Sequence, residues 1–288
     1  MIRARGLTKR YGAVLAVDDL SFDVGPGAVT GFLGANGAGK STTMRMTLGL
    51  DAPTAGSVTV AGRAYRDLPS PVREVGALLD PRCMHPGRSA RAHLRWMADA
   101  AGIRRSRVEE VLELVGVAHV ADRRVGTFSL GMRQRVGIAG ALLGDPGVLL
   151  LDEPLNGLDP EGIRWLRTLL RDLAHEGRTV FVSSHLLHEM EQVAQRVVVI
   201  ARGRLVDEFE VGRAAAVRVR PADAGLVAAL RAAGADVTAV EGGLEVRGVP
   251  AHQVGELALE HRVALHELVE RRDGLEEAYL ALTRAGAP

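Results

Sequence analysis

Residues 31–42 read GFLGANGAGKST, and this stretch determines the fold class. The apolar run AVTGFL over 28–33 is typical of a buried strand, and TTMRMTLGL over 42–50 is compatible with a helix. The phosphate-binding motif requires this context, a glycine-rich loop between a strand and a helix. The letters GANGAGKS over 34–41 match the motif in full, so we predict a P-loop nucleotide site and not an ordinary glycine-rich turn.

The residue types in this loop suit a triphosphate. Glycines let backbone N–H groups converge on phosphate oxygens, and the start of the following helix adds a favourable dipole. Lys40 would place a positive charge on the β- and γ-phosphates, and it is one of only two lysines in the chain. The hydroxyl of Ser41 can hold Mg²⁺. The predicted nucleotide ligands of the loop are Gly34, Asn36, Gly37, Gly39, Lys40, Ser41 and Thr42.

A second apolar strand ends in two carboxylates, because residues 148–153 read VLLLDE. Alone, a strand that ends in Asp-Glu is commonly a solvated strand end. Downstream of a P-loop the same pattern predicts the acid that completes the phosphate site. We expect Asp152 to hold the metal shell and Glu153 to polarise the attacking water as a general base.

The remaining chain alternates strands and helices, which favours an α/β fold with a mostly parallel sheet. Residues 75–79 and 178–184 read as further buried strands, and helical patterns dominate an insert that begins at about 82. From about 213 the pattern changes to strand, helix, hairpin, helix, strand and a last helix over 274–285. We therefore predict an ATP-binding domain over 1–212 and a small α+β accessory domain over 213–288.

The composition is that of a soluble globular protein, with 288 residues of which 47% are hydrophobic and 25% charged. Lys and Arg total 36 against 35 Asp and Glu, and a net charge of +1 argues against a nucleic-acid partner. The single cysteine, Cys83, cannot form an internal disulfide and fits a reducing compartment. No apolar run reaches the roughly 18 residues that cross a bilayer, and the N-terminus lacks the pattern of a signal peptide. Any role at a membrane would need a separate partner.

Several motifs follow one another along the chain. They are Tyr11, GANGAGKST at 34–42, SLGMRQR at 129–135, LLLDEP at 149–154, GLDP at 157–160 and SSH at 183–185. In order and spacing the chain resembles the ATP-binding cassette (ABC) family from residue 2 to about 210. The resemblance implies a P-loop NTPase cassette with a mostly parallel core sheet, an N-terminal antiparallel β part and a helical signature subdomain over about 82–145.

Three longer segments indicate which members of the family the chain resembles most. SLGMRQRVGIAGALLGDP over 129–146, NGLDP over 156–160 and LEEAYLALT over 275–283 are most similar to the ATP-binding subunits of drug and antibiotic-resistance exporters. The resemblance implies that Ser129 and Gly131 contact the γ-phosphate of an ATP held by the opposite protomer. A serine before a helix is also an ordinary N-cap, and both uses need the same free N–H groups.

Three more residues take roles from the resemblance. Asp159 would lie in a loop that crosses the dimer interface, although an aspartate before a proline is also a common turn residue. His185 would contact the γ-phosphate and help to position Glu153, so that Lys40, Glu153 and His185 form the predicted catalytic set. Tyr11 would stack on adenine, with a plain packing role as the alternative.

The sequence departs from the family pattern in two places. The signature that usually reads Leu-Ser-Gly-Gly-Gln reads Phe-Ser-Leu-Gly-Met over 128–132, and because the serine and the second glycine are kept we expect ATP binding to be kept. The glutamine usually found after the strand at 75–79 is replaced by Asp80. A carboxylate here can approach Mg²⁺, which makes Asp80 a candidate metal ligand beside Ser41 and Asp152, but it adds negative charge near the phosphates. A simple Asp-Pro turn is the alternative.

The resemblance implies the ATP-binding and ATP-hydrolysing subunit of an ABC exporter. It would dimerise around two ATP–Mg²⁺, with a second copy of itself or a homologous subunit. From the cytoplasmic face of the cell membrane it would power a separate integral membrane permease, whose helix would dock in a groove of the helical insert, for drug or antibiotic efflux. The alternatives are an importer ATPase, a cassette ATPase that acts on nucleic acid or ribosomes, and a regulatory subunit without turnover.

Overall fold

The computed structural model describes residues 1–211, 216–221 and 225–271, and these residues form two compact units. The first unit runs from Met1 to Phe209 and the second begins at Glu210. The helix predicted over 274–285 lies outside the described residues. No helix in the part of the chain that the structure describes is both long enough and apolar enough to span a bilayer.

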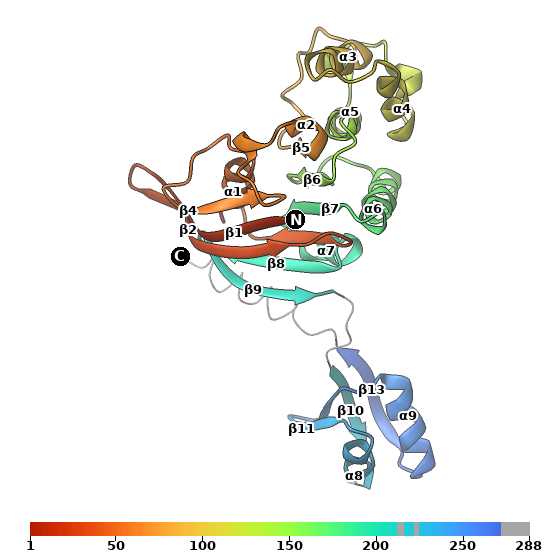
Figure 1. The fold of residues 1–288 in the computed structure, drawn as a ribbon. Coiled ribbons are helices and arrows are strands. Elements are labelled where there is room, and N and C mark those ends of the chain that lie inside the picture. The colour runs from red at the N-terminus through yellow and green to blue at the C-terminus, as the bar shows by residue number, and fades with distance from the viewer. Residues whose placement is uncertain (212–215, 222–224, 272–288) are drawn as a thin grey trace. The chain divides into compact units, whose positions relative to one another are not determined.

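The first unit is built on a six-stranded sheet in the order β5-β6-β7-β3-β8-β9 (Figure 1). The pairs from β5 through β8 are all parallel, and β3, β6 and β7 are buried over their whole length. Such continuous apolar strands need cover on both faces of the sheet. The α/β class and the parallel core expected from the sequence are confirmed. The strands are β3 (Val29–Leu33), β5 (Val75–Leu78), β6 (Val148–Leu151), β7 (Thr179–Ser184), β8 (Arg196–Ala201) and β9 (Arg204–Glu210).

The N-terminal β part is a separate antiparallel sheet in the order β2-β1-β4. These strands are β1 (Ile2–Tyr11), β2 (Val14–Val24) and β4 (Ala55–Val60). In β1 the first residues alternate between buried and exposed, so that one face of the strand is available for the core. The register pairs Ile2 with Val24 on one side and with Val60 on the other.

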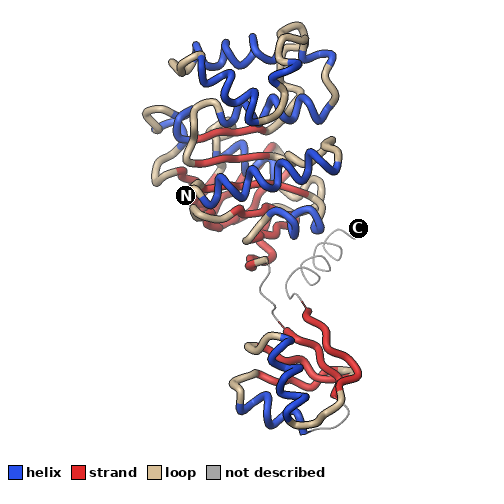
Figure 2. The backbone as a smooth tube through the Cα atoms, turned by 90° about the vertical axis from the view of Figure 1, so that its right-hand side faces the viewer, coloured by secondary structure: helices blue, strands red, loops and turns tan. Residues whose placement is uncertain are grey.

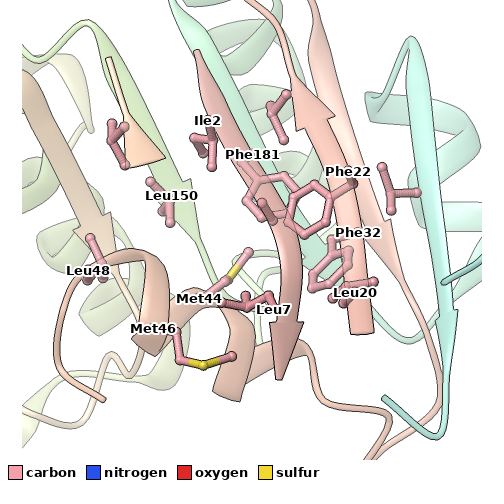
Figure 3. Close-up of a cluster of buried hydrophobic side chains, with 14 of the residues drawn as sticks. Ile2, Leu7, Leu20, Phe22, Phe32, Met44, Met46, Leu48, Leu150 and Phe181 are labelled. Atoms are coloured by element: carbon pink, nitrogen blue, oxygen red, sulfur yellow. The ribbon is translucent and has the colours of Figure 1, made fainter. Parts of the chain in front are cut away.

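The two sheets share one core (Figure 3). Phe22 of the antiparallel sheet stacks on Phe32 and Phe181 of the parallel sheet, with ring centroids 5.5 and 5.6 Å away. Met44 and Met46 of helix α1 (Lys40–Thr47) belong to the same cluster. Burying these large apolar side chains stabilises the packing of the two sheets and of α1 against one another.

Helices cover the other face of the parallel sheet. Helix α6 (Pro160–His175) contacts β7 and β3, and the short helix α7 (Leu187–Val193) packs beside it. A Cβ at Gly31 would lie 2.7 Å from the sulfur of Met190 in α7, so the glycine allows α7 to pack closely on β3. The face opposite to Phe32 is therefore closed by α7.

A helical region lies between β5 and β6 and forms the upper part of Figures 1 and 2. It contains α3 (Ala90–Ala100), α4 (Ser106–Leu114) and α5 (Leu130–Leu142), which contact one another. Short 3₁₀ turns at Ala118–Val120 and Val125–Thr127 connect α4 to α5, a third at Tyr65–Asp67 follows β4, and the short helix α2 (Pro71–Glu74) precedes β5. Leu94, Val111 and Leu112 are fully buried between these helices.

The second unit has its own sheet and its own core. Its strands are antiparallel in the order β11-β12-β10-β13, and buried residues such as Val219, Leu230 and Val254 form a cluster separate from that of the first unit. The order strand, helix, hairpin, helix and strand agrees with the sequence expectation. The elements are β10 (Ala216–Pro221), α8 (Gly225–Ala232), β11 (Asp236–Val240), β12 (Gly243–Arg247), α9 (Ala251–Glu260) and β13 (Leu265–Arg271).

Candidate nucleotide site

The glycine-rich loop joins the end of β3 to the start of α1, as the sequence predicts. Gly39 has φ +106°, and a Cβ atom there would lie 2.6 Å from the carbonyl oxygen of Ala16. Gly37 also has a positive φ, of +80°. Because side chains are strained in this region of backbone conformation, glycine is needed for the loop to turn sharply into the helix.

The loop presents free hydrogen-bond donors. Within the described residues, the backbone N–H groups at 36, 37 and 39–42 form no hydrogen bond. The N–H groups at 40–42 belong to the first turn of α1, where a helix has no internal acceptors and carries a partial positive charge. Asn36, Gly37 and Ser41 are exposed. These donors fit an anionic ligand such as a polyphosphate.

Lys40 is held over this loop although it is only 6% exposed. Its Nζ donates hydrogen bonds to the carbonyl oxygens of Gly34 at 2.6 Å and Ala35 at 3.3 Å. The same Nζ lies 3.3 Å from Oε1 of Glu153. A buried ammonium group is costly unless it is paired, and here the carbonyls and one carboxylate supply the partners.

Asp152 and Glu153 follow β6 directly. Asp152 is 7% exposed, and the Ser183 hydroxyl donates a hydrogen bond of 2.5 Å to its Oδ1. Its Oδ2 forms no hydrogen bond among the described residues and is free to take a ligand. Glu153 has φ +49°, which is unusual for a residue with a side chain, and its N–H donates to Oγ of Ser183 at 2.8 Å.

The structure brings the three predicted catalytic residues together. Nδ1 of His185, just after β7, lies 2.9 Å from Oε2 of Glu153, while Lys40 faces Oε1 of the same carboxylate. The Glu153 side chain is therefore held between a cation and an imidazole, with about a fifth of its surface exposed. A carboxylate in this position can accept a proton from a water bound beside a phosphate.

The predicted metal ligands also share a site. Ser41, Asp80 and Asp152 all line one cavity of about 500 Å³. Two of the three are carboxylates and one is a hydroxyl, which is the oxygen donor set that Mg²⁺ prefers. The residues present therefore fit a magnesium ion.

Asp80 is already engaged by a residue near it in sequence. Its Oδ1 accepts hydrogen bonds from the backbone N–H of Arg82 at 2.8 Å and from Nε of Arg82 at 3.1 Å. These bonds hold the pKa of the Asp80 carboxyl below its usual value, so the group is charged at neutral pH. The Asp-Pro turn is present, and the role of Asp80 as a metal ligand stays a prediction.

The residues predicted to face a second copy cap helices in the structure. The Ser129 hydroxyl accepts from the N–H of Met132 at the start of α5, and the Asp159 carboxylate accepts from the N–H of Gly162 at the start of α6. Gly131 packs so closely on the loop before α6 that a Cβ would lie 2.9 Å from the carbonyl oxygen of Gly157. Within the described residues, no hydrogen bond joins these groups to the phosphate loop of the same chain. Their predicted role stays untested.

Tyr11 lies at the end of β1 and is 44% exposed. Its hydroxyl donates to Oδ2 of Asp51 at 2.7 Å, and this hydrogen bond raises the pKa of the phenol. Nζ of Lys9 lies 4.8 Å from the centre of the ring. The ring is thus fixed in place and accessible, and its stacking on a base stays a prediction.

The sequence analysis missed residues that hold the site in place. Ser183 contacts both carboxylate residues at the end of β6, and Arg82 forms an ion pair with Asp80. The amide of Gln134 in α5, a residue that is 1% exposed, lies 3.5 Å from the carbonyl oxygen of Glu153. The serine pair before His185 was a visible signal, but the partner of each hydroxyl depends on how β6 and β7 are paired.

Comparisons with known proteins agree with this geometry. The family model described as ABC transporter matches residues 17–156, and a model described as a domain of unknown function matches residues 215–276. A bacitracin transport ATP-binding protein of Bacillus licheniformis is 44% identical over 212 residues, which are 73% of this chain and 69% of that protein. A lantibiotic transport ATP-binding protein of Streptococcus pyogenes is 36% identical over 73% of this chain and 91% of its own length. The solved structure of an ATP-binding subunit of an ABC transporter superposes with a TM-score of 0.68 at 25% identity, over 91% of this chain and 99% of that one.

Proposed function

The chain belongs to the ABC transporter family as an ATP-binding and ATP-hydrolysing subunit, and from this premise we propose how its residues act and what they drive. The observation that carries the proposal is the contact of Glu153 with both Lys40 and His185, beside a loop whose N–H groups are free. In this arrangement a cation, a base and anion-binding donors converge on one point. Hydrolysis of a phosphoanhydride needs these three elements.

ATP would be bound through the loop of residues 34–42. Its phosphates would replace Glu153 as the partner of the Lys40 ammonium group, because a polyphosphate carries more charge than one carboxylate. Glu153, released from Lys40 but still held by His185, would then accept the proton of the attacking water. His185 thus orients the base, and Lys40 binds charge that develops on the phosphate.

Asp152, Ser41 and Asp80 are the residues that would hold Mg²⁺. The free Oδ2 of Asp152 and the cavity that these residues share support this assignment. When bound, the ion would neutralise charge on the β- and γ-phosphates.

Each ATP would be shared between two copies of the chain. The N–H groups at 130 and 131, in the first turn of α5, form no hydrogen bond within the described residues, so this helix start also suits an anion. Ser129 and Gly131, at this helix start, would contact the ATP that the partner copy binds. Asp159 would lie at the interface between the copies. Tyr11 would stack on the adenine.

The conformational change that accompanies dimerisation around ATP would be passed to a separate permease in the membrane. We expect its cytoplasmic helix to dock at the helical region, where Met84 and Met97 help to line the cavity of about 500 Å³ that reaches Asp80. The chain would then lie on the cytoplasmic face of the membrane through this partner. The bacitracin and lantibiotic relatives support export of a peptide antibiotic as the task.

The Glu153→Gln variant tests the proposal. We expect the wild-type chain to release phosphate from ATP, and the variant to bind ATP but turn it over at least about 100-fold more slowly, because the base is lost. The variant should also form dimers only when ATP is present, measured by size-exclusion chromatography with light scattering. Glu176→Gln, which removes an exposed carboxylate that pairs with Arg178, is the control and should behave like the wild type.

A Glu153→Gln chain that hydrolyses ATP at the wild-type rate, or that never dimerises with ATP, would contradict the assigned roles. Export is tested separately by purifying the tagged chain from membranes of its source and identifying the proteins that travel with it. We expect an integral membrane protein among them, and its absence would argue against transport.

A further inference from the structure

Ser183 is the last residue but one of β7 and is 1% exposed. Its hydroxyl contacts Asp152 and Glu153, the two residues after β6 that are proposed to act in ATP hydrolysis. The distance to Oδ1 of Asp152 is 2.5 Å, and the distance to the backbone nitrogen of Glu153 is 2.8 Å. The proposed mechanism assigns this serine no task.

The direction of these two hydrogen bonds is fixed by proton counting. The backbone N–H of Glu153 can only donate, so the serine oxygen accepts there. The single proton of the hydroxyl is then available for Asp152, whose Oδ1 must accept it. The Ser183 hydroxyl therefore occupies one oxygen of the Asp152 carboxylate and leaves the other for a metal ion.

The same serine holds an unfavourable backbone conformation. Glu153 has φ +49°, which lies in the left-handed region that is unfavourable for a residue with a side chain. The bond from its N–H to Ser183 fixes one side of the Glu153 residue, and the amide of Gln134 lies at 3.5 Å from the carbonyl on the other side. In this conformation the side chain reaches both Lys40 and His185.

We propose that Ser183 is a positioning residue for ATP hydrolysis, which sets the free oxygen of Asp152 toward the metal and the carboxylate of Glu153 toward the water. This inference rests on the proposed function and adds a residue to it. Ser183 itself would touch neither ATP nor the water. Its effect should therefore appear in kcat and in the magnesium requirement, and not in the binding of the nucleotide alone.

Three variants at this position make the test. Ser183→Ala and Ser183→Cys both remove the hydroxyl, and the cysteine keeps a side chain of nearly the same shape as a packing control. Losing a residue that orients metal ligands typically costs about 10- to 100-fold, so we expect kcat to fall by that factor in both. Ser183→Thr keeps the hydroxyl on a residue that suits a strand, and it should restore most of kcat.

A second readout is equilibrium binding of a fluorescent ATP analogue. Without Mg²⁺ the affinity should stay within about twofold of the wild type, because Lys40 and the loop keep their contacts. The Mg²⁺ concentration at the midpoint of the metal-dependent increase should rise about tenfold or more in Ser183→Ala and Ser183→Cys. A role in packing alone would change thermal stability but not this midpoint.

Thr30→Val is the matched control. Thr30 lies in the neighbouring strand β3, is 1% exposed, and its hydroxyl has no hydrogen-bond partner among the described residues. Its removal should change neither kcat nor the magnesium midpoint. If Ser183→Ala does not fold, Ser183→Cys and Ser183→Thr still decide the question.

Wild-type kcat and an unchanged magnesium midpoint in Ser183→Cys would overturn the inference, as would a Ser183→Thr chain that is as impaired as Ser183→Cys. A wild-type chain that hydrolyses no ATP would instead contradict the proposed function. Failure of the inference about Ser183 and failure of the proposed function therefore give different results.

Discussion

The Asp80 carboxylate and the Arg82 side chain that pairs with it place an extra charge pair beside the nucleotide site. Both groups are partly exposed, so the arginine screens the carboxylate only in part. We predict that Asp80→Asn binds ATP without Mg²⁺ about two- to fivefold more tightly, which corresponds to the loss of roughly 0.4–1 kcal/mol of repulsion. Asparagine keeps the oxygen that accepts from the Arg82 N–H, so the turn should survive.

The measurement is a nucleotide titration in excess chelator, with thermal unfolding as the check that the fold is kept. Weaker or unchanged binding would show that Asp80 does not act on the phosphates through its charge.

His93 in α3 is a half-buried titratable group of the helical region. Burial, together with the nearby charge of Arg88, lowers the pKa of its imidazole, and its Nδ1 is buried without a hydrogen-bond partner among the described residues. An unfolded chain binds a proton at this histidine near pH 6.5, whereas the folded chain binds it only at lower pH. The free energy of unfolding should therefore fall as the pH drops below about 6.5.

Urea unfolding at pH 8 and at pH 5.5 tests this sign. His93→Phe keeps an aromatic ring near Trp96 but cannot bind a proton, so it should lose less stability than the wild type over the same interval. Equal losses in the two proteins would mean that other groups account for the pH dependence.

At the scale of elements, the phosphate loop depends on one glycine more than on the others. Gly39 has a φ of +106°, which strains any residue with a side chain. A Cβ there would also lie only 2.6 Å from the carbonyl oxygen of Ala16. Strain of this kind costs roughly 1–3 kcal/mol, so Gly39→Ala should bind ATP about 5- to 150-fold more weakly. Gly12→Ala is the control, because Gly12 has a φ of +56° but no neighbour within 4 Å.

Isothermal titration of both variants with ATP gives the comparison. Gly12→Ala should lose about 1 kcal/mol of stability and keep its affinity within about twofold. If the two alanine variants bind ATP equally well, close packing at Gly39 is not what shapes the loop.

The elements that the sequence predicts best are those whose signal is local. The run 28–33, the loop 34–41 and the helix after it each carry their own pattern, and the structure has them where expected. The contact between Asp152 and Ser183 has no such signal. It exists because β6 and β7 pair with Leu151 opposite Val182, which brings the next residue of each strand together. The register of parallel strands depends on the packed whole, so these bonds could not be predicted from the chain alone.

The left-handed backbone of Glu153 escaped prediction for the same reason. Non-glycine residues adopt it where surrounding contacts fix it, and here those contacts come from β7, α5 and α1. The helix caps at Ser129 and Asp159 were foreseeable, because serine and aspartate before a helix are local signals. Whether a second chain uses the same helix starts is a property of an assembly.

At the scale of the whole molecule, each of the two units of the described residues has buried hydrophobic side chains that pack among themselves, and we propose that residues 1–212 and 213–288 are separate domains. The core around Phe32 and Phe181 belongs to the first unit, and the core around Val219 and Leu230 belongs to the second. Each unit also completes its own sheets, since no sheet of the described residues combines strands from both. Cooperative unfolding follows such cores, so we expect the full chain to show two calorimetric transitions.

ATP and Mg²⁺ should move only one of these transitions, because every residue of the proposed nucleotide site lies in the first unit. At about 100 times its dissociation constant a ligand stabilises the state that binds it by roughly 2.7 kcal/mol, which for a unit of this size raises Tm by roughly 5–10 °C. The transition of the second unit should stay within about 1 °C, and in the Gly39→Ala chain the shift of the first should shrink along with the affinity. A single transition whose Tm rises with ATP would mean that the second unit unfolds together with the first. The two units would then form one cooperative domain, which would contradict the proposed division at residue 212.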